Sequence, residues 1–342
     1  MERKMRFALV GAGVISTSHA KAITSNSHAE LVAVCDKEIE KAQKLAETYQ
    51  IGSVYQDYQE MLKRDDIDVI NVCLPSGMHS DYTVEAAQAG KHILCEKPLD
   101  ITREKMDRMI NETRSRGVKL GVIYQRRTFP AAVATRNAIQ TGKLGKMVLG
   151  DAYLKYYRSP EYYKSAGWRG TWALDGGGAL MNQGVHGIDL IQWMMGDIHS
   201  VFAYSSALVR DIEVEDTAVA AVKYKSGAFG VIQGTTSVYP GQETRFEVHG
   251  NDGSIIFGDS GFKQWKFQGS DEEAPQVEAT ASASNDPKNI SANGHFILVD
   301  DMIKAILDNR DPMVTGEEAR KAVNVILAIY QSAREGKEIV IG

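Results

Sequence analysis

The stretch Val10-Gly11-Ala12-Gly13-Val14-Ile15-Ser16 decides the fold of the first part of the chain. It follows the apolar run Phe7 to Val10 and precedes a helical pattern that starts at Ser18, so a strand turns into a helix here. A Gly-x-Gly turn at such a place permits a tight bend at Gly11 and a close approach of the backbone to a bound group at Gly13. The helix start adds free N–H groups and a positive dipole end, which together suit a pyrophosphate.

Short apolar runs alternate with helical stretches on either side of this turn. The runs are rich in β-branched residues and nearly continuous, as is typical of strands buried on both faces of a parallel sheet; they are 7–10, 31–35, 69–74, 92–95 and 120–124. The helical stretches between them are 18–25, 38–49, 58–63, 82–89 and 103–115. The connections are short enough for right-handed βαβ units. Residues 1–125 are therefore predicted to form a doubly wound, parallel Rossmann domain of the α/β class.

The pattern changes near Pro130. After a helix over 131–140, polar and apolar residues alternate in the segments 147–157, 201–208, 218–224, 228–235 and 244–249, with a further helix over 187–195. This predicts an α+β domain with a mostly antiparallel sheet over residues 126–342. The polar segment from Ser270 to Asn293 is expected to be a surface loop. Final helices over 296–307 and 317–333 are amphipathic and can pack on either domain.

Composition and charge exclude several classes of partner. The chain has 342 residues and a net charge of −5, with no basic run, so neither a nucleic acid nor an anionic membrane surface is an expected partner. No apolar stretch approaches the roughly 20 residues that span a bilayer, and the first apolar run is too short for a secretory signal. The three cysteines are an odd number without metal-site spacing. We expect buried thiols and a cytoplasmic protein.

Three further segments lie at the ends of predicted strands. Asp36 ends the second strand roughly 20 residues after the glycine turn, where a carboxylate accepts hydrogen bonds from both adenosine ribose hydroxyls and repels a 2′-phosphate. This favours NAD over NADP; Lys37 beside it would soften that preference unless it is simply a solvated lysine. The third and fourth strands end in Leu74-Pro75-Ser76-Gly77-Met78-His79 and in Glu96-Lys97-Pro98. Open α/β sheets bind ligands at such ends, although Glu96 and Lys97 could also be a surface ion pair.

The chemistry of the second domain is expected near a glycine-rich stretch, residues 175–189. Asn182, His186 and Asp189 are spaced i, i+4 and i+7, so they share one face of a helix. Asn182 or Asp189 can orient the imidazole, and histidine is well suited to proton transfer near neutral pH. The alternative is a core histidine bonded to a helix neighbour. A metal site is not expected, because one histidine and one aspartate do not make a zinc ligand set.

These motifs resemble the Gfo/Idh/MocA family of oxidoreductases, which includes glucose–fructose oxidoreductase and inositol dehydrogenases. The resemblance rests on the Gly-x-Gly-x-x-Ser turn, on Glu96-Lys97-Pro98 and on the stretch that leads to His186, and it covers nearly the whole chain. It implies a Rossmann domain, a second domain with an open sheet used for dimer or tetramer contacts, a nicotinamide cofactor and a carbohydrate substrate. It also implies that Lys97 lies beside the nicotinamide and the reacting hydroxyl.

The resemblance makes His186 the acid/base. Asn182 is expected to take part in catalysis by orienting either His186 or a neighbouring hydroxyl. The residues expected to bind NAD are Gly11, Gly13, Val14, Ile15, Asp36, Lys37, Leu74, Pro75, Ser76, His79, Glu96, Lys97, Trp168 and Arg169. The last two match a Trp-Arg pair that contacts the cofactor in some relatives. The residues expected to bind the substrate are Lys97, Arg127, Tyr157, Asn182 and His186. Tyrosines in a strand region are, however, more often packing residues.

The function expected from these features is reversible oxidation of a ring secondary hydroxyl of a sugar, sugar nucleotide or cyclitol by NAD. Inositol dehydrogenases carry an aspartate where this chain has Asn182, which weakens the hypothesis that the substrate is an inositol. The segments 169–172 and 210–217 are more similar to the branch that oxidises C3 of UDP-N-acetylglucosamine-type sugars. The alternatives are an inositol 2-dehydrogenase, a glycosidase or epimerase that uses NAD internally, and a non-catalytic NAD-dependent regulator.

Overall fold

The computed structural model describes residues 3–279, 284–285 and 293–342. The chain divides into two units. Unit 1 comprises Met1–Gln125 and Ser291–Arg320, and unit 2 comprises Arg126–Ile290 and Lys321–Gly342. The first boundary between the two units therefore lies between Gln125 and Arg126. The last boundary lies between Arg320 and Lys321, inside the helix α10 (Gly316–Glu335).

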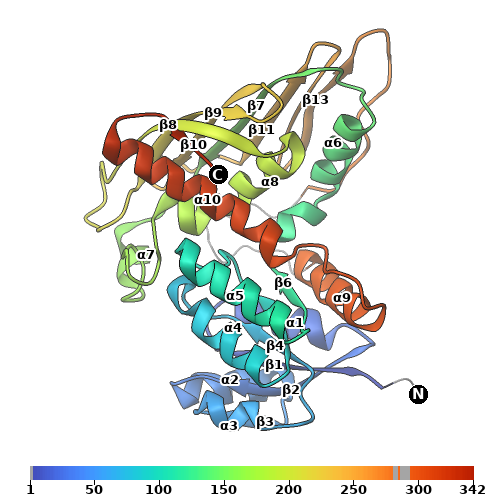
Figure 1. Ribbon diagram of the computed structural model, residues 1–342, viewed down its shortest axis with the longest axis vertical. Helices are drawn as coiled ribbons and strands as arrows, with labels where there is room; N and C mark the ends of the chain where they lie inside the picture. The colour runs from blue at the N-terminus through green and yellow to red at the C-terminus, as the bar shows by residue number, and fades with distance from the viewer. Residues whose placement is uncertain (1–2, 280–283, 286–292) are drawn as a thin grey trace. The chain divides into compact units, whose positions relative to one another are not determined.

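Unit 1 is built on a parallel sheet with the strand order β3-β2-β1-β4-β5-β6 (Figure 1). The strands are β1 (Met5–Val10), β2 (Ala29–Cys35), β3 (Ser53–Tyr55), β4 (Val69–Val72), β5 (His92–Cys95) and β6 (Leu120–Val122). From β1 the strands follow one another outward in one direction to β3, and from β4 they follow one another in the opposite direction to β6. This change of direction between β1 and β4 confirms the predicted doubly wound sheet. Only β3 was not predicted, because three half-buried residues are too few to form a pattern.

The helices of unit 1 follow the predicted alternation. They are α1 (Ser16–Thr24), α2 (Ile39–Tyr49), α3 (Tyr58–Leu62), η1 (Ser76–Met78), α4 (His79–Gln88), α5 (Arg103–Ser115) and α9 (Asn293–Leu307). Helix α4 packs beside α5, whereas α1 packs beside α2 and α9. A helix from near the end of the chain thus lies against the helix that follows the glycine turn, as the amphipathic pattern allowed.

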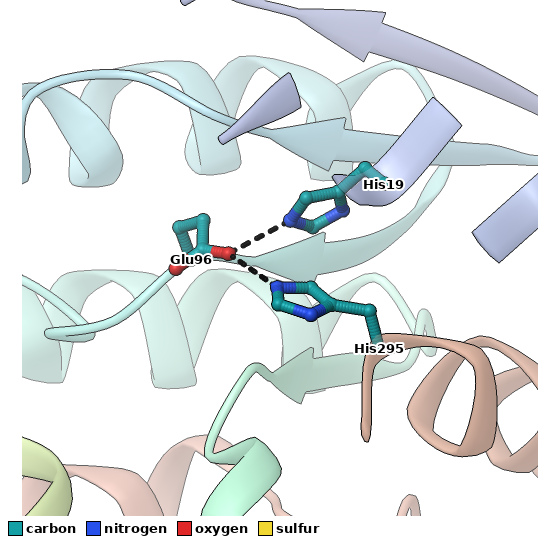
Figure 2. Close-up of side chains that lie close together, drawn as sticks. All are labelled: His19, Glu96 and His295. Atoms are coloured by element: carbon teal, nitrogen blue, oxygen red, sulfur yellow. Dashed lines mark hydrogen bonds and ion pairs between the residues drawn. The ribbon is translucent and has the colours of Figure 1, made fainter. Parts of the chain in front are cut away.

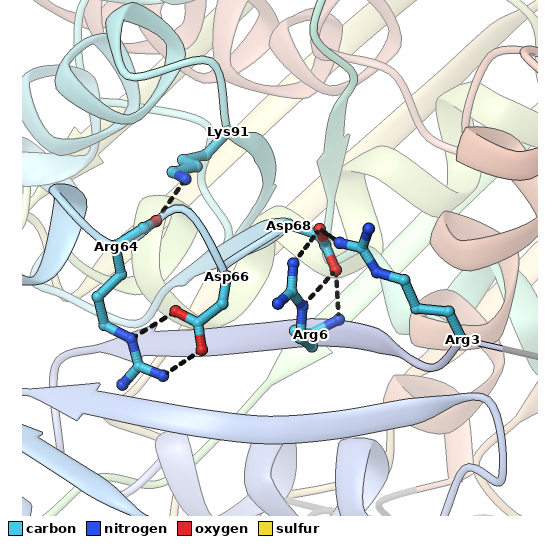
Figure 3. Close-up of polar contacts among 6 residues, drawn as sticks. All are labelled: Arg3, Arg6, Arg64, Asp66, Asp68 and Lys91. Atoms are coloured by element: carbon cyan, nitrogen blue, oxygen red, sulfur yellow. Dashed lines mark hydrogen bonds and ion pairs between the residues drawn. The ribbon is translucent and has the colours of Figure 1, made fainter.

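The amino ends of the strands of unit 1 carry a group of ion pairs (Figure 3). Asp68, directly before β4, accepts hydrogen bonds from the backbone N–H of Arg6 at 2.8 Å and from the guanidinium of Arg3 at 2.7 Å. Burial opposes the charge of Asp68, but the bonds from Arg6 outweigh it and lower the pKa of this carboxyl. Arg64 pairs with Asp66 nearby at 2.6 Å. These ion pairs lie at the end of the sheet opposite the predicted ligand-binding end.

Unit 2 contains a second sheet with the strand order β13-β12-β11-β7-β10-β9-β8-β14, antiparallel except between β7 and β10. The strands are β7 (Met147–Lys155), β8 (Ile198–Ser206), β9 (Thr217–Tyr224), β10 (Phe229–Thr235), β11 (Arg245–Gly250), β12 (Gly253–Gly258), β13 (Gly261–Phe267) and β14 (Ile339–Val340). The predicted mostly antiparallel sheet is confirmed. Strands β12 and β13 were missed because both begin with glycine and are separated by glycine-rich turns, which usually indicate loops. Strand β14 was missed because two residues are too few to form a pattern.

The helices of unit 2 are η2 (Gln125–Thr128), α6 (Pro130–Gln140), α7 (Pro160–Lys164), a π-helix η3 (Ala179–Gly184) and α8 (Val185–Met195). Helix α8 packs on β7 and on α6. In the polar segment expected as a surface loop, residues 271–279 have no regular secondary structure, and 280–283 and 286–292 lie outside the described residues. In the part of the chain that the structure describes, no helix has the length and apolar character needed to cross a membrane.

Candidate active site

The glycine turn between β1 and α1 has the geometry that its sequence predicts. Gly11 has φ +94°, and a Cβ atom there would lie 2.4 Å from the carbonyl oxygen of Cys73, so no other residue fits without displacing backbone. Its N–H donates to the carbonyl of Cys35 at 2.8 Å, which ties the turn to the end of β2. Gly13 is exposed, and nothing lies within 4 Å of the position of its Cβ. The turn therefore leaves open backbone at Gly13 for a ligand to approach.

Asp36 joins the end of β2 to this turn. Its carboxylate accepts the N–H of Ala12 at 2.7 Å and the N–H of Glu38 at 2.8 Å. The side chain is half-buried beside the glycine turn, whereas Lys37 is exposed. The negative group thus lies at the strand end where the ribose of a dinucleotide binds in this class of sheet.

His79 connects the next two strand ends. Its Nδ1 lies 2.8 Å from the carbonyl oxygen of Pro98 and its Nε2 lies 2.8 Å from that of Leu74. The ring is fully buried, so it holds the Leu74 and Lys97–Pro98 segments together. A direct contact of His79 with the cofactor stays a prediction.

Glu96 is the centre of a buried cluster that sequence reasoning missed (Figure 2). Its Oε1 lies 2.8 Å from Nε2 of His19 and 3.4 Å from Nε2 of His295, and its Oε2 accepts the backbone N–H of Lys97 at 3.1 Å. Burial opposes the charge on Glu96, but the bonds from the two histidines outweigh it and hold the pKa of the carboxyl well below its usual range. No local pattern links these residues, which come from α1, from the turn after β5 and from α9.

The residues of unit 1 fit a dinucleotide. The open backbone at Gly13, the start of α1 and the carboxylate of Asp36 lie at one edge of the sheet, the edge formed by the carboxyl ends of β1 and β2. The free N–H groups of a helix start suit a pyrophosphate and the carboxylate suits ribose hydroxyls. Leu74 and Pro75 at the end of β4 are half-buried at the same edge, as expected. Val14 is exposed and Ile15 half-buried.

The segment Ala179–Met195 of unit 2 carries the candidate catalytic residues. Nearly all of it is buried, and the half-buried exceptions in its first half are Asn182, Gln183 and His186. Asn182 donates its Nδ2 to Asp175 at 2.7 Å. These three polar side chains thus interrupt an otherwise buried segment. Whether Asn182 orients His186 stays a prediction.

Arg127 and Asp189 form a buried ion pair in unit 2. The guanidinium donates to both carboxylate oxygens, at 2.8 and 2.6 Å. The bidentate geometry and the burial make this a structural link between η2 and α8. Asp189 is thus engaged with Arg127, which does not favour the expected role of Asp189 in orienting His186. The same pairing gives Arg127 a structural role, and its contact with substrate stays a prediction.

Aromatic and guanidinium groups gather around Tyr162, close to Gln183. The hydroxyl of Tyr162 accepts hydrogen bonds from Arg169 at 2.5 Å and from Gln183 at 2.8 Å. The Arg169 guanidinium also lies over the rings of Tyr162 and Trp168, at 4.3 and 4.6 Å from their centroids. Gln183 was not predicted, although its place next to Asn182 in the sequence was a signal. Trp168 and Arg169 are half-buried.

Tyr157, another expected substrate residue, lies beyond the end of β7. Its ring packs edge-on against Tyr239 with centroids 5.0 Å apart, and the Arg210 guanidinium lies 5.3 Å from its centroid. The side chain is half-buried, as a packing residue or a ligand contact would be.

The buried carboxylate of Glu215 holds the backbone that leads into η3. It accepts the N–H groups of Gly178 and Leu180, each at 2.8 Å, and the hydroxyl of Tyr330 at 2.9 Å. A Cβ on Gly178 would lie 1.8 Å from the backbone oxygen of Glu215. The glycine at position 178 thus lets the backbone approach Glu215 closely. Burial outweighs these bonds and raises the pKa of Glu215 to about 7.

Comparison with known proteins gives matches to both units. Residues 5–124 match the family described as an oxidoreductase family with an NAD-binding Rossmann fold, and residues 133–256 match the GFO/IDH/MocA C-terminal domain. The WlbA dehydrogenase from Bordetella pertussis, solved in complex with NADH and UDP-GlcNAcA, is 34% identical with 99% of each chain covered and a TM-score of 0.89.

Two curated enzymes extend the comparison. Myo-inositol 2-dehydrogenase of Thermotoga maritima is 27% identical over 98% of both chains. D-glucoside 3-dehydrogenase of Escherichia coli is 34% identical over 59% of this chain and 57% of its own.

The two glycines of the turn supply a matched test of cofactor binding. Gly11→Ala forces a Cβ against the Cys73 carbonyl at φ +94°, so we expect a loss of at least about 2 kcal/mol in the free energy of unfolding and no NAD binding. Gly13→Ala meets no atom, so its stability should stay within about 0.5 kcal/mol of the parent. Its methyl group stands where the pyrophosphate approaches, so the Kd for NAD should rise about 10-fold or more. Calorimetry measures both quantities, and parental NAD affinity in Gly13→Ala would place the pyrophosphate elsewhere.

Glu215 predicts a pH dependence for the stability of unit 2. With a pKa of about 7 in the folded state against 4.5 unfolded, its carboxyl keeps a proton in the folded state that the unfolded chain has lost. The protonated carboxyl of Glu215 therefore adds its full contribution to the free energy of unfolding below pH 4.5. That contribution is lost as the pH rises through 7. Between pH 5 and pH 8 the loss should be roughly 2–3 kcal/mol.

This dependence can be measured by urea unfolding of the parent and of Glu215→Gln. The chain has four tryptophans, at positions 168, 172, 193 and 265, and all of them lie in unit 2, so their fluorescence follows this unit. The unfolding free energy of the parent minus that of Glu215→Gln should fall with rising pH. The substitution also changes stability by an amount that does not depend on pH, and this amount does not affect the slope. A difference that is flat from pH 5 to pH 8 would contradict the raised pKa.

Proposed function

The chain belongs to the Gfo/Idh/MocA family of NAD-binding oxidoreductases, and from that premise we propose that it oxidises a ring secondary hydroxyl of a UDP-N-acetylhexosamine-type nucleotide sugar or its uronate to a ketone. One observation carries this choice of substrate. The chain is 34% identical, over 99% of its length, to a dehydrogenase solved with NADH and UDP-GlcNAcA. Asn182, at the position where inositol dehydrogenases carry an aspartate, supports the same choice over a cyclitol.

The proposed chemistry divides between Lys97 and His186. Bound NAD supplies the nicotinamide that takes up the hydride from the carbinol carbon. His186 accepts the hydroxyl proton as that bond breaks, and Lys97, as an ammonium group, donates a hydrogen bond to the oxygen and stabilises its developing charge. The carbon loses a hydride and the oxygen a proton, which leaves a ketone. Asn182, held by Asp175 at 2.7 Å, orients His186 or a neighbouring substrate hydroxyl.

Guanidinium groups in unit 2 support an anionic substrate. Arg210 is half-buried and lies 5.3 Å from the ring centroid of Tyr157, whereas Arg169, which lies over Tyr162, is expected to bind the cofactor. Such stacked guanidinium groups recognise phosphate and carboxylate groups by bidentate hydrogen bonds. A diphosphate or a uronate offers these groups, whereas an inositol offers neither.

A glycosidase or epimerase that oxidises and then reduces the same sugar is the second candidate. Lys97 and His186 would serve it equally well, so the two functions differ in whether NADH is released. The similarity to proteins named as dehydrogenases favours the first candidate.

Three buried free thiols support a cytoplasmic location for the protein. Burial raises the pKa of Cys73 and of Cys95 well above the usual range, so both remain thiols at neutral pH. Cell fractionation with an antibody against the chain tests the location.

The outer face of the unit 2 sheet supports a homodimer or homotetramer. Tyr204 on β8 is 74% exposed and Phe229 on β10 is 59% exposed, and Phe202 on β8 and Val219 on β9 are exposed as well. Exposed large apolar side chains on one sheet are typical of a subunit interface. We expect Tyr204→Glu together with Phe229→Glu to convert the assembly to a smaller species in light scattering. The control Leu307→Glu changes an exposed apolar residue of α9 and should leave the mass unchanged; an unchanged mass in the double variant would contradict this interface.

The substrate proposal predicts NADH release with one class of sugar. Purified, cofactor-stripped protein is mixed with NAD and, separately, with UDP-GlcNAcA, UDP-N-acetylglucosamine, myo-inositol and free hexoses, and the absorbance of NADH is followed. We expect NADH with the UDP-hexosamines or their uronates and at least about 10-fold less with NADP, because Asp36 repels a 2′-phosphate.

Two variants serve as controls for that assay. His186→Ala should abolish the signal and Lys97→Met should lower turnover by roughly 100-fold or more, since each removes a group that acts on the hydroxyl. NADH from inositol alone would replace the proposed substrate with a cyclitol. Tight NAD binding with sugar turnover but no NADH would favour the internal-redox enzyme.

A further inference from the structure

A buried cluster around the carboxylate of Glu96 joins four segments of unit 1 that lie far apart in the sequence, with Asn71 reaching it through His19. His19 comes from α1, Asn71 from β4 and His295 from α9, and Glu96 follows β5. His19 and His295 are fully buried and Glu96 is 4% exposed. A buried carboxylate is costly unless donors surround it, and apolar side chains would stabilise a core more cheaply. The cluster therefore needs a reason beyond packing.

The hydrogen bonds of the cluster define where its protons are. The amide nitrogen of Asn71 lies 2.8 Å from Nδ1 of His19 and donates to it, so the proton of this imidazole is on Nε2. Nε2 then donates to Oε1 of Glu96 at 2.8 Å. His295 donates from its Nε2 to the same oxygen at 3.4 Å, and its Nδ1 has no hydrogen-bond partner among the described residues. Both histidines thus donate from Nε2 to a single carboxylate oxygen.

The other carboxylate oxygen acts on the neighbouring residue. Oε2 of Glu96 accepts the backbone N–H of Lys97 at 3.1 Å. Rotation of the carboxylate would break this bond together with those from His19 and His295. The two histidines therefore restrict the main chain from which the Lys97 side chain extends.

We propose that His19 and His295 are positioning residues, which hold Glu96 and thereby fix the main chain of Lys97 and the direction of its ammonium group. The inference rests on the proposed function, because it requires Lys97 to act on the substrate hydroxyl. It also explains why a helix near the end of the chain packs against α1: α9 supplies one of the two donors. The glycine turn is thereby linked to Lys97, because the helix α1 that follows the turn carries His19, which contacts Glu96.

A transition metal is the rival occupant of the cluster, since two histidines and a carboxylate are ligands that such metals accept. A metal would need a lone pair on Nε2 of each histidine. The bond from Asn71 to Nδ1 leaves the proton of His19 on Nε2, the nitrogen that faces Glu96. Hydrogen bonds therefore account for the arrangement of all three side chains.

The test compares two substitutions at one position. His295→Gln keeps an N–H donor at about the reach of Nε2, whereas His295→Leu removes the donor and keeps apolar bulk. With NAD and UDP-GlcNAcA as probes, His295→Leu should lower kcat about 10- to 100-fold, the cost of a misplaced catalytic group, with the KM for NAD within about 2-fold. His295→Gln should retain kcat within about 3-fold. If thermal melts show that His295→Leu does not fold, His19→Leu and His19→Gln give the same comparison.

A double-mutant cycle separates positioning from a general structural effect. If His295 acts through Lys97, His295→Leu should cause no further loss of kcat in the Lys97→Met background. Equal losses in the two backgrounds, or equal kcat for the Leu and Gln variants, would overturn the proposal. Stoichiometric zinc, iron or copper in the purified protein that is lost in His295→Leu would replace it with a metal site.

A second readout does not depend on the substrate. Reductive methylation with 13C-formaldehyde labels the lysines, and the NMR signal that disappears in Lys97→Arg belongs to Lys97. This signal should shift in His295→Leu and stay in place in His295→Gln; an unshifted signal in both would overturn the proposal. If Lys97→Met keeps parental activity, the proposed role of Lys97 in the reaction fails, while the NMR signal still decides whether the histidines position it.

Discussion

The contact between Gly11 and the carbonyl of Cys73 is the constraint on which the nucleotide end of this protein depends. With only 2.4 Å between that oxygen and the position of a Cβ, the chain passes from β1 to α1 close against β4, and only glycine allows this. The direction of α1 follows from this turn, and α1 carries His19 to the carboxylate of Glu96. The same turn presents open backbone at Gly13. One backbone contact thus sets both the candidate pyrophosphate site and one support of the Lys97 segment.

Each unit uses a buried carboxylate to hold the backbone next to a candidate catalytic residue. Glu96 accepts the N–H of Lys97, and Glu215 accepts N–H groups at the start of the π-helix that carries Asn182. The two carboxyls differ in pKa because their donors differ. Burial disfavours both charges, but two imidazoles outweigh it at Glu96 and lower its pKa, whereas backbone amides and a tyrosine do not outweigh it at Glu215, whose pKa rises to about 7. Carboxylates are costly in a core, so both are better explained by what they hold than by stability.

Much of the fold was predictable because it depends on local patterns. Continuous apolar runs, helical periodicity and the glycine turn predicted the strands β1, β2, β4, β5 and β6, and alternation predicted β7 to β11. The strands that were missed, β3, β12, β13 and β14, are short or begin with glycine, so their residues pair as strands only because neighbouring strands already offer an edge. Among the candidate site residues, Arg127 and Asp189 illustrate the limit. Arg127 was expected to bind substrate and Asp189 to orient His186, and no local pattern indicated that the two would pair with each other, at 2.6 Å across 62 residues of sequence.

The sequence by itself determined the two-part α/β and α+β architecture and the NAD-type turn with Asp36. It also singled out the segments around Lys97 and His186 as the candidate catalytic segments. These features depend on residues that are close together in the sequence. Their apolar periodicity can be recognised directly, and glycine marks positions whose backbone conformation few other residues can adopt. Only the tertiary structure decided which distant groups meet. His19 and His295 lie 77 and 199 residues from Glu96 in the sequence and converge on one of its oxygens. Such a meeting follows from the packing of α1 and α9 and not from any local pattern, because a hydrogen bond between distant residues has no periodicity to reveal it.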